Sequence, residues 1–159
     1  MDTYQEEQPA ASTATKKFPN IHFYDQDFVD IYDQTWLWSN DSWKKPTVKS
    51  KISVRHFNHP ENDTIRQFEN IVSTFSLVYS NRIYPAGNQL DIFYERQEEN
   101  GAIRCEYSEK DGKPVLAKDN PEGVHPPLFS WAEYNIYHKI GNKKRIRDVL
   151  PILERYYEW

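Results

Sequence analysis

Features that mark several common classes of protein are scarce in this 159-residue chain. Cys105 is its one cysteine, so an intrachain disulfide is impossible and no cysteine zinc site is spelled out. The five glycines form neither a phosphate-binding loop nor a dinucleotide fingerprint. No apolar run approaches the ~20 residues of a membrane span, and the N-terminus lacks the apolar segment of a secretory signal. We therefore expect a cytoplasmic protein that needs no cofactor and has no membrane partner.

Neither sign of charge dominates: the chain has 20 Lys and Arg and 24 Asp and Glu, which give a net charge of -4. The basic residues are scattered, so nucleic acid is not an expected partner. Aromatic residues, by contrast, make up 15% of the chain, with 5 Trp and 11 Tyr. Two interpretations remain open: the rings build a core and interfaces, or they stack on a flat ligand such as a sugar or a base.

The spacing of the hydrophobic residues predicts a mainly α fold with a short β segment. Residues 1–20 are polar and rich in Ala, Ser and Thr, and we expect them to be disordered. Residues 21–43 carry a helical pattern with Asp25 or Asp27 as a candidate N-cap. Ile52–Phe57 predict a short strand, and "AIRCEY" further along is extended.

Two further helices follow in the central part of the chain. The first can be capped by Asp63 or Thr64, and its apolar residues recur at helical spacing: Ile65, Phe68, Val72, Phe75 and Tyr79. The second opens at Pro85 and ends at Asn100-Gly101. The first helix is apolar most of the way round, which predicts that it is buried within a larger assembly.

The last 35 residues predict a helical hairpin. Pro126 and Pro127 open its first helix, and Gly141-Asn142 turns the chain into a second helix in which Pro151 is expected to cause a kink. Aromatic residues in the final turn have no obvious cover, so the sequence predicts half of an apolar interface at this end.

Few residues indicate chemistry by their pattern alone. His56 and His59 lie near Glu61, but with no second cluster they are better explained as ordinary surface residues, and no metal site is predicted. Cys105 lacks the cationic surroundings of a nucleophile. Glu69 is more informative, because a carboxylate on a mostly apolar helix must be paired, exposed or directed at a ligand.

Gln97 and Arg104 flank the segment "EENGAI". A helix end, a glycine turn and an extended segment would bring both to one end of the helices. Arg104 could then bind hydroxyls or a carboxylate with its forked guanidinium, or it could be an ordinary loop arginine.

The ordered set "FYERQEENGAIRCEY" and, after a loop, "HPPLFSWAEYNIYHKIGNKKRIRDVLPILERYYEW" resembles the six-hairpin glycosidases. This group includes trehalase, the glucosidases that trim mannosyl-oligosaccharides, and mannosylglycerate hydrolase-like enzymes. The resemblance covers Thr64 to Trp159. It implies an (α/α)6 toroid, in which six helical hairpins form two concentric rings. Residues 21–159 would then be the N-terminal part of the catalytic domain and supply about two of the hairpins.

The resemblance also implies substrate-binding residues. Phe68 and Glu69 fall where the family has a Trp-Asp pair that holds sugar hydroxyls, and Gln97 falls at the family's glutamine before the glycine turn. Arg104 would lie on the strand that lines the pocket. The family's pocket wall is matched by Pro126, Pro127 and Trp131.

Two departures from the family pattern affect the expected sugar specificity: Phe-Glu replaces Trp-Asp, and His125 precedes the prolines. The family's general acid and general base, which stand ~6.5–9.5 Å apart in inverting enzymes, have no match here. No catalytic residue is assigned, and we expect the segment alone to be inactive.

Three hypotheses about function follow from the sequence. The chain is the N-terminal segment of a glycoside hydrolase that acts on α-linked glycosides by inversion, with a carbohydrate substrate and the remaining hairpins of the parent domain as its partners. Alternatively, it is a non-catalytic carbohydrate-binding remnant. Finally, it is a helical interaction module whose apolar last hairpin docks on another protein.

Overall fold

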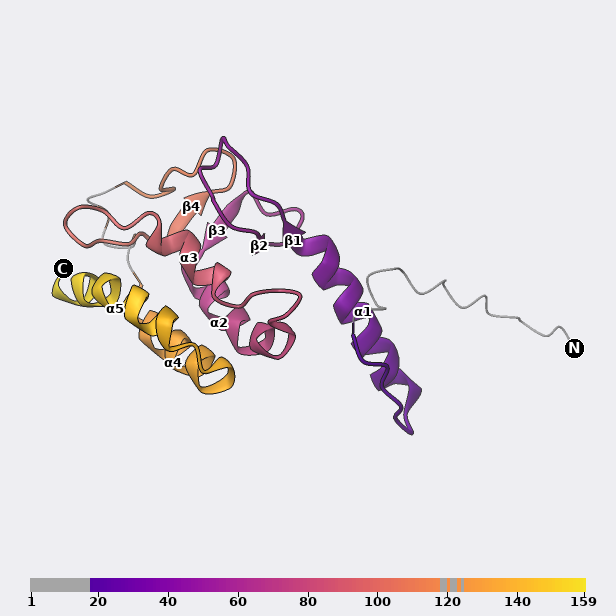
Figure 1. The fold of residues 1–159 in the computed structure, drawn as a ribbon. Helices are drawn as coiled ribbons and strands as arrows, with labels where there is room; N and C mark the ends of the chain where they lie inside the picture. The colour runs from indigo at the N-terminus through magenta and orange to yellow at the C-terminus, as the bar shows by residue number, and fades with distance from the viewer. Residues whose placement is uncertain (1–17, 118–119, 121–122, 124) are drawn as a thin grey trace, which may run out of the picture. The chain divides into compact units, whose positions relative to one another are not determined.

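The computed structural model describes residues 18–117, 120, 123 and 125–159. These residues form a mainly helical structure with short strands (Figure 1), as the sequence predicted. The chain divides into two compact units, Met1–Ser42 and Trp43–Trp159. The first unit contains α1 (Gln26–Ser42). The second contains, in chain order, β1 (Trp43–Lys44), β2 (His56–Phe57), β3 (Thr64–Arg66), α2 (Gln67–Leu77), η2 (Val78–Ser80), α3 (Asn88–Tyr94), β4 (Glu106–Ser108), α4 (Phe129–Ile140) and α5 (Lys143–Glu158).

In the first unit, the predicted cap is confirmed. The Asp25 carboxylate accepts a hydrogen bond of 3.0 Å from the backbone N–H of Asp27 at the start of α1. The segment before the helix packs back on it, because Phe18 stacks on Trp36 with ring centroids 3.8 Å apart. Residues 1–17 lie outside the described residues, so the prediction of disorder is not addressed there.

In the second unit, the start of α2 differs from the prediction. Thr64 does not cap a helix but begins strand β3, which pairs antiparallel with β4. Arg66 is still extended, and α2 starts at Gln67 without a side-chain cap. The physical reason is the pairing of residues 64–66 with β4, because backbone groups bonded to β4 are not free to bond within a helix. A 2.8 Å bond from the Gln67 N–H to the Cys105 carbonyl continues this pairing.

Two other predicted elements are shorter than expected. The helix predicted to open at Pro85 is α3, which begins only at Asn88 and ends at Tyr94. After Glu95 two backbone N–H groups bond to carbonyls three residues back, as in a 3-10 helix. Of the strand predicted at Ile52–Phe57, only β2 forms, paired with β1. The partner strand β1 is only two residues long, so β2 has no backbone partner that would extend it further.

The helices of the second unit have a defined direction. Phe75 of α2 lies against Trp131 near the start of α4, with centroids 4.3 Å apart. Further along both elements, the Lys139 ammonium lies over the Tyr79 ring. The order of contacts is the same in both elements, so α2 and α4 run side by side in the same direction (Figure 1).

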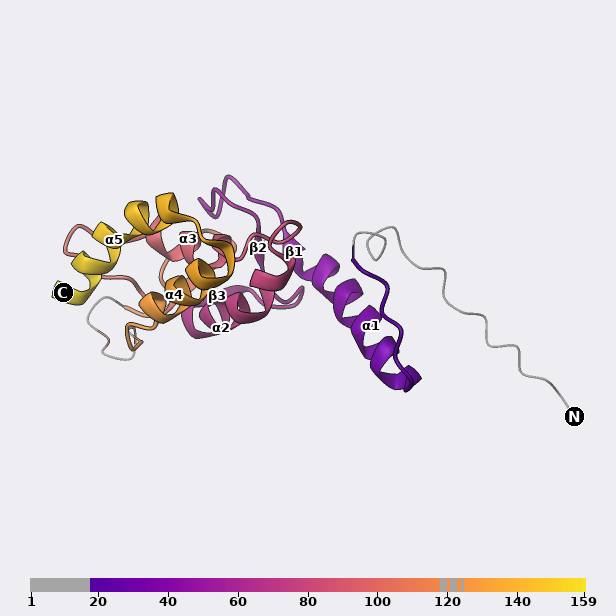
Figure 2. The ribbon, with the colours of Figure 1, turned by 60° about the horizontal axis from the view of Figure 1, so that its bottom comes forward.

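The last two helices form the predicted hairpin, and α5 returns beside α4 (Figure 2). Gly141 ends α4 with a left-handed φ of 72°. The Asn142 side chain then caps α5 by accepting a 3.1 Å bond from the Arg145 N–H. Pro151 lies inside α5, which is assigned as one continuous helix.

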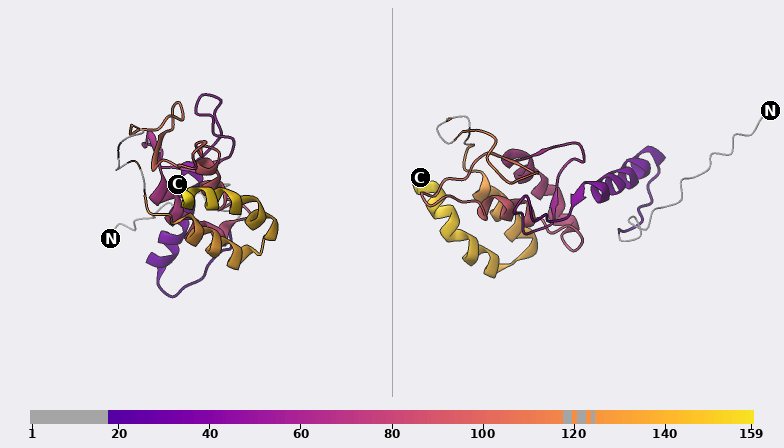
Figure 3. Two further views of the ribbon diagram at one scale, coloured as in Figure 1. Left: turned by 90° about the vertical axis from the view of Figure 1, so that its left-hand side faces the viewer. Right: turned by 90° about the horizontal axis from the view of Figure 1, so that it is seen from above.

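The core of the second unit is centred on Phe129, which is fully buried at the start of α4. Its ring contacts Phe93 and Tyr94 of α3 and Tyr156 of α5, with centroids 5.3–5.8 Å apart. One aromatic side chain therefore joins three helices, and this packing fixes the α4–α5 hairpin (Figure 3) on the rest of the unit.

Candidate functional site

An exposed aromatic face lies along the α2–α4 pair. It consists of Phe68, Val72, Phe75, Tyr79 and Trp131. The first four recur at helical spacing along α2 and η2, and Trp131 lies against Phe75. Phe68 and Trp131 are 51% and 54% exposed, which is unusual for such large apolar side chains. The face can stack on the ring of a flat ligand.

Charged groups adjoin the aromatic face at the start of α2. Glu69 is half exposed and pairs with Arg66 at 3.2 Å. The same guanidinium reaches Glu106 of β4 at 3.1 Å. Hydrogen bonds to Glu106 and Glu69 raise the pKa of Arg66. Partial burial raises the pKa of Glu106, but hydrogen bonds from Thr64 and Arg66 outweigh it, so the pKa is lowered overall.

The site residues taken from the resemblance thus divide into two groups. Phe68, Glu69, Pro127 and Trp131 are exposed to solvent and available to a ligand. Pro127 lies in the segment just before α4, four residues before Trp131. Their assignment to sugar binding stays a prediction.

Gln97 is partly buried and Arg104 is buried. The Gln97 amide donates to the carbonyls of Gly101 and Ile152 at 3.0 and 2.8 Å, so it ties the glycine turn to α5. Arg104 is only 5% exposed and donates to the Glu98 carboxylate at 2.9 Å. In this arrangement both side chains support the loop after α3 rather than face solvent.

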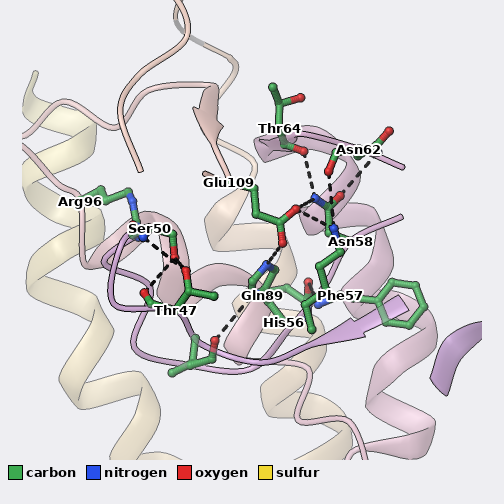
Figure 4. Close-up of polar contacts among 12 residues, drawn as sticks. Thr47, Ser50, His56, Phe57, Asn58, Asn62, Thr64, Gln89, Arg96 and Glu109 are labelled. Carbon is green, nitrogen blue, oxygen red and sulfur yellow. Dashed lines mark hydrogen bonds and ion pairs between the residues drawn. The ribbon is translucent and has the colours of Figure 1, made fainter. Parts of the chain in front are cut away.

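A polar cluster around Glu109 was not found by sequence reasoning. One carboxylate oxygen of Glu109 lies 3.2 Å from His56 Nε2, and the other accepts a bond of 2.7 Å from Asn58 (Figure 4). The second oxygen also accepts a bond of 2.7 Å from Lys44. Partial burial raises the pKa of Glu109, but the bonds from His56, Lys44 and Asn58 outweigh it and lower the pKa to about 2. The carboxylate is therefore ionised at neutral pH and cannot act there as a general acid.

The Glu109 cluster has a structural role. It fixes the two ends of residues 45–55, which connect β1 to β2 and which we call the strap. Inside the strap, Arg96 donates to the Ser50 carbonyl at 2.7 Å (Figure 4), and Ser53 bonds to the Glu95 carboxylate. Side chains of α3, β4 and their flanks thus hold a segment that has no regular structure.

A buried ion network joins α3, α4 and α5. Arg145 of α5 donates two bonds to Glu133 of α4, at 2.9 and 2.7 Å, and pairs with Asp91 of α3 at 3.0 Å. Tyr94 donates to the same Glu133 carboxylate at 3.0 Å. Burial lowers the pKa of Arg145, but its hydrogen bonds with Glu133 and Asp91 outweigh that effect and raise it. Every charge in this network has a partner, so its arrangement indicates a structural role.

The described residues lack two other kinds of feature. No group of three or more His, Cys, Asp or Glu side chains among them could hold a metal ion. None of the helices in the described part of the chain is long and apolar enough to cross a bilayer. Cys105 is buried, and burial raises the pKa of its thiol, so it lacks the low pKa of a reactive cysteine.

Comparison with known proteins gives one informative match. The chain is 45% identical over 145 residues to an uncharacterized protein of Borreliella burgdorferi. The alignment covers 91% of this chain but 30% of that protein, so the chain spans less than a third of the length of its relative. No family model and no solved structure matches the chain.

Proposed function

We propose that this chain is the N-terminal, sugar-binding segment of a glycoside hydrolase whose catalytic domain is an (α/α)6 toroid. The observation that carries the proposal is the pairing of α2 and α4 in the same direction, with an exposed aromatic face and a carboxylate along them. In a toroid of helical hairpins, helices of one ring run in the same direction and the returning helices form the other ring. Here α2 and α4 would belong to the inner ring, and α3 and α5 to the outer ring.

The chemistry of the aromatic face suits a carbohydrate. Trp131 and Phe68 offer apolar ring surfaces to the faces of a sugar, and Glu69 can accept hydrogen bonds from its hydroxyls. Arg66 holds the Glu69 carboxylate at the edge of the face. These residues bind and orient a glycoside but supply no acid and base pair.

The general acid and general base of the proposed α-glycoside hydrolysis by inversion would come from the remaining hairpins of the parent domain. The length of the Borreliella burgdorferi relative supports this division, since the alignment takes up 30% of it and leaves room for four further hairpins. The chain alone is expected to bind sugar without hydrolysing it.

Calorimetric titration with a panel of α-linked disaccharides tests the proposal. We expect Glu69→Gln and Trp131→Ala each to weaken binding about 10-fold, the cost of one hydrogen bond to a charged group or one stacked ring. Tyr24→Ala removes an exposed ring from the other unit and serves as the matched control. Absence of binding by the unaltered chain across the panel would contradict the proposal.

A second experiment concerns the parent activity. The longer Borreliella burgdorferi relative should hydrolyse an α-linked disaccharide, and nuclear magnetic resonance of the first product should show the β-anomer. Hydrolysis with retention would reject inversion, and hydrolysis by the 159-residue chain alone would reject the division of roles.

One observation favours a second candidate function, the helical interaction module. An apolar groove lies along the α4–α5 hairpin, and a further helix could pack there.

A further inference from the structure

The groove between α4 and α5 is an apolar surface without cover in the described residues. It encloses about 600 Å³. Its lining includes Tyr134 and Tyr137 of α4 and Leu150 and Tyr157 of α5. Tyr134 is 63% exposed and Tyr157 is 65% exposed. Large apolar side chains at this exposure mark an interaction site.

The spacing of the apolar residues on α5 indicates what kind of element fits. Ile146, Leu150, Leu153 and Tyr157 all line the groove and are separated by four, three and four residues. This is the alternation of a helix that packs along another helix. The occupant of the groove is therefore a helix with a similar apolar stripe.

Three charged residues line the groove: Glu133, which is bonded to Arg145, and Lys143 and Glu154, which mark its ends. Lys143 and Glu154 both line it, eleven residues apart on α5. Eleven residues of α-helix make slightly more than three whole turns, so the two side chains lie on the same side, ~16 Å apart. The surface is basic at one end, apolar in the middle and acidic at the other end.

We propose that this face binds the same face of a second copy of the chain. A two-fold axis makes the two α5 helices antiparallel, and it places Lys143 opposite the partner's Glu154 and Glu154 opposite the partner's Lys143. The surface is thus complementary to itself, which an interface with two-fold symmetry requires. In this register the axis passes between Asp148 and Val149, so the two copies of Leu150 lie beside the axis, offset by ~4.5 Å along the helices.

The size of the face sets the expected affinity. Helices of 12 and 16 residues are ~18 and ~24 Å long, and two helices side by side are ~20 Å wide, so the face covers roughly 400 Å². This is small for a stable interface, which buries about 800 Å² per partner. We expect a monomer–dimer equilibrium with a dissociation constant in the micromolar range.

Sedimentation velocity of the 159-residue chain over a wide concentration range tests the dimer. Lys143→Glu and Glu154→Lys should each weaken association at least ~10-fold, because each places like charges opposite one another twice. The double variant should restore association. Reversal of the exposed Lys144–Asp148 pair on the same helix is the matched control and should change nothing.

A cross-linking experiment checks the position of the axis. Leu150→Cys should form a disulfide-linked dimer under a copper–phenanthroline oxidant, because the two thiols lie close together across the axis. Val48→Cys is the control, since Val48 is 97% exposed and lies on the strap. Cys105 is buried and should not contribute.

Three results would overturn the proposal: a monomer at every concentration, a dimer that both single charge reversals leave intact, or no cross-link at position 150 in a dimeric sample. Sugar binding is measured separately on the α2–α4 face, so failure of the dimer leaves the proposed function standing, and the reverse also holds.

Discussion

Glu109 depends on partners that come from distant parts of the sequence. His56, Lys44 and Asn58 all precede it by more than fifty residues, yet each lies within 3.2 Å of its carboxylate. Together they lower its pKa from 4.5 to about 2. The unfolded chain has no such contacts, so its Glu109 binds a proton at higher pH than the folded chain does. The stability from this group is present above pH ~4.5 and is lost as the pH falls towards ~2.

Replacement of Glu109 tests this account. We expect Glu109→Gln to lower the free energy of unfolding by about 1–3 kcal/mol at pH 7, because the charged hydrogen bonds to Lys44 and His56 are lost. The difference between the variant and the original chain should shrink between pH ~4.5 and ~2. Urea unfolding at several pH values measures it, with Glu158→Gln, at the exposed end of α5, as control. A difference that stays constant with pH would contradict the assignment.

At this scale the sequence predicts local interactions and misses distant ones. The Asp25 cap was predicted because its partner is two residues away. A partner for Glu69 was among the expected outcomes, and Arg66 lies three residues before it. Nothing in the sequence links Glu109 to His56 or Glu133 to Arg145, because those pairs form only when separate elements pack. The sequence placed Gln97 and Arg104 near one end of the helices, and the resemblance added a role in sugar binding; the structure shows their bonds to other residues of the fold.

At the scale of elements, the turns are set by backbone conformation. Gly101 and Gly141 both have positive φ, of 96° and 72°, but their surroundings differ. A Cβ at Gly101 would overlap the carbonyl oxygen of Arg155 in α5, whereas a Cβ at Gly141 would meet nothing within 4 Å. The turn after α3 therefore approaches α5 so closely that only glycine fits.

These two glycines give a matched pair of substitutions. Gly141→Ala should lower the free energy of unfolding by about 1 kcal/mol, because alanine adopts the left-handed conformation at a cost. Gly101→Ala should lower the free energy of unfolding by more, about 3 kcal/mol, because α5 must also shift away from the turn. Thermal unfolding of both variants measures the difference. Equal losses would show that α5 moves freely at this contact.

The periodicity of apolar residues correctly predicted that the helices exist, but several boundaries were wrong. Thr64 begins a strand rather than a helix because residues 106–108 pair with it. Such a partner, more than forty residues away, leaves no local signal. The α4–α5 hairpin was predicted well, since its turn is encoded by the adjacent Gly141 and Asn142.

At the scale of the whole molecule, the two units differ in their share of the core. All the buried hydrophobic side chains among the described residues lie between Ile52 and Tyr156, within the second unit. The second unit therefore contains a hydrophobic core of its own, which is the requirement for independent folding.

Removal of residues 1–42 tests this independence. We expect the fragment 43–159 to unfold cooperatively with a midpoint within about 5 °C of the full chain, a shift that corresponds to roughly 1 kcal/mol for a domain of this size. Calorimetry of both proteins measures it. A fragment that shows no cooperative transition would mean that the first unit contributes to the core of the second.

The shared direction of α2 and α4 also has an electrostatic consequence. Each helix carries a dipole whose positive end lies at its first turn. Because Trp131 near the start of α4 lies against Phe75 near the end of α2, the positive end of α4 lies beside the negative end of α2. Glu69 stands in the first turn of α2, and Trp131 lies near the start of α4. The dipole of α2 favours negative charge at its first turn, where Glu69 stands. A ligand group with negative charge would be attracted to that turn, and one with positive charge would be repelled.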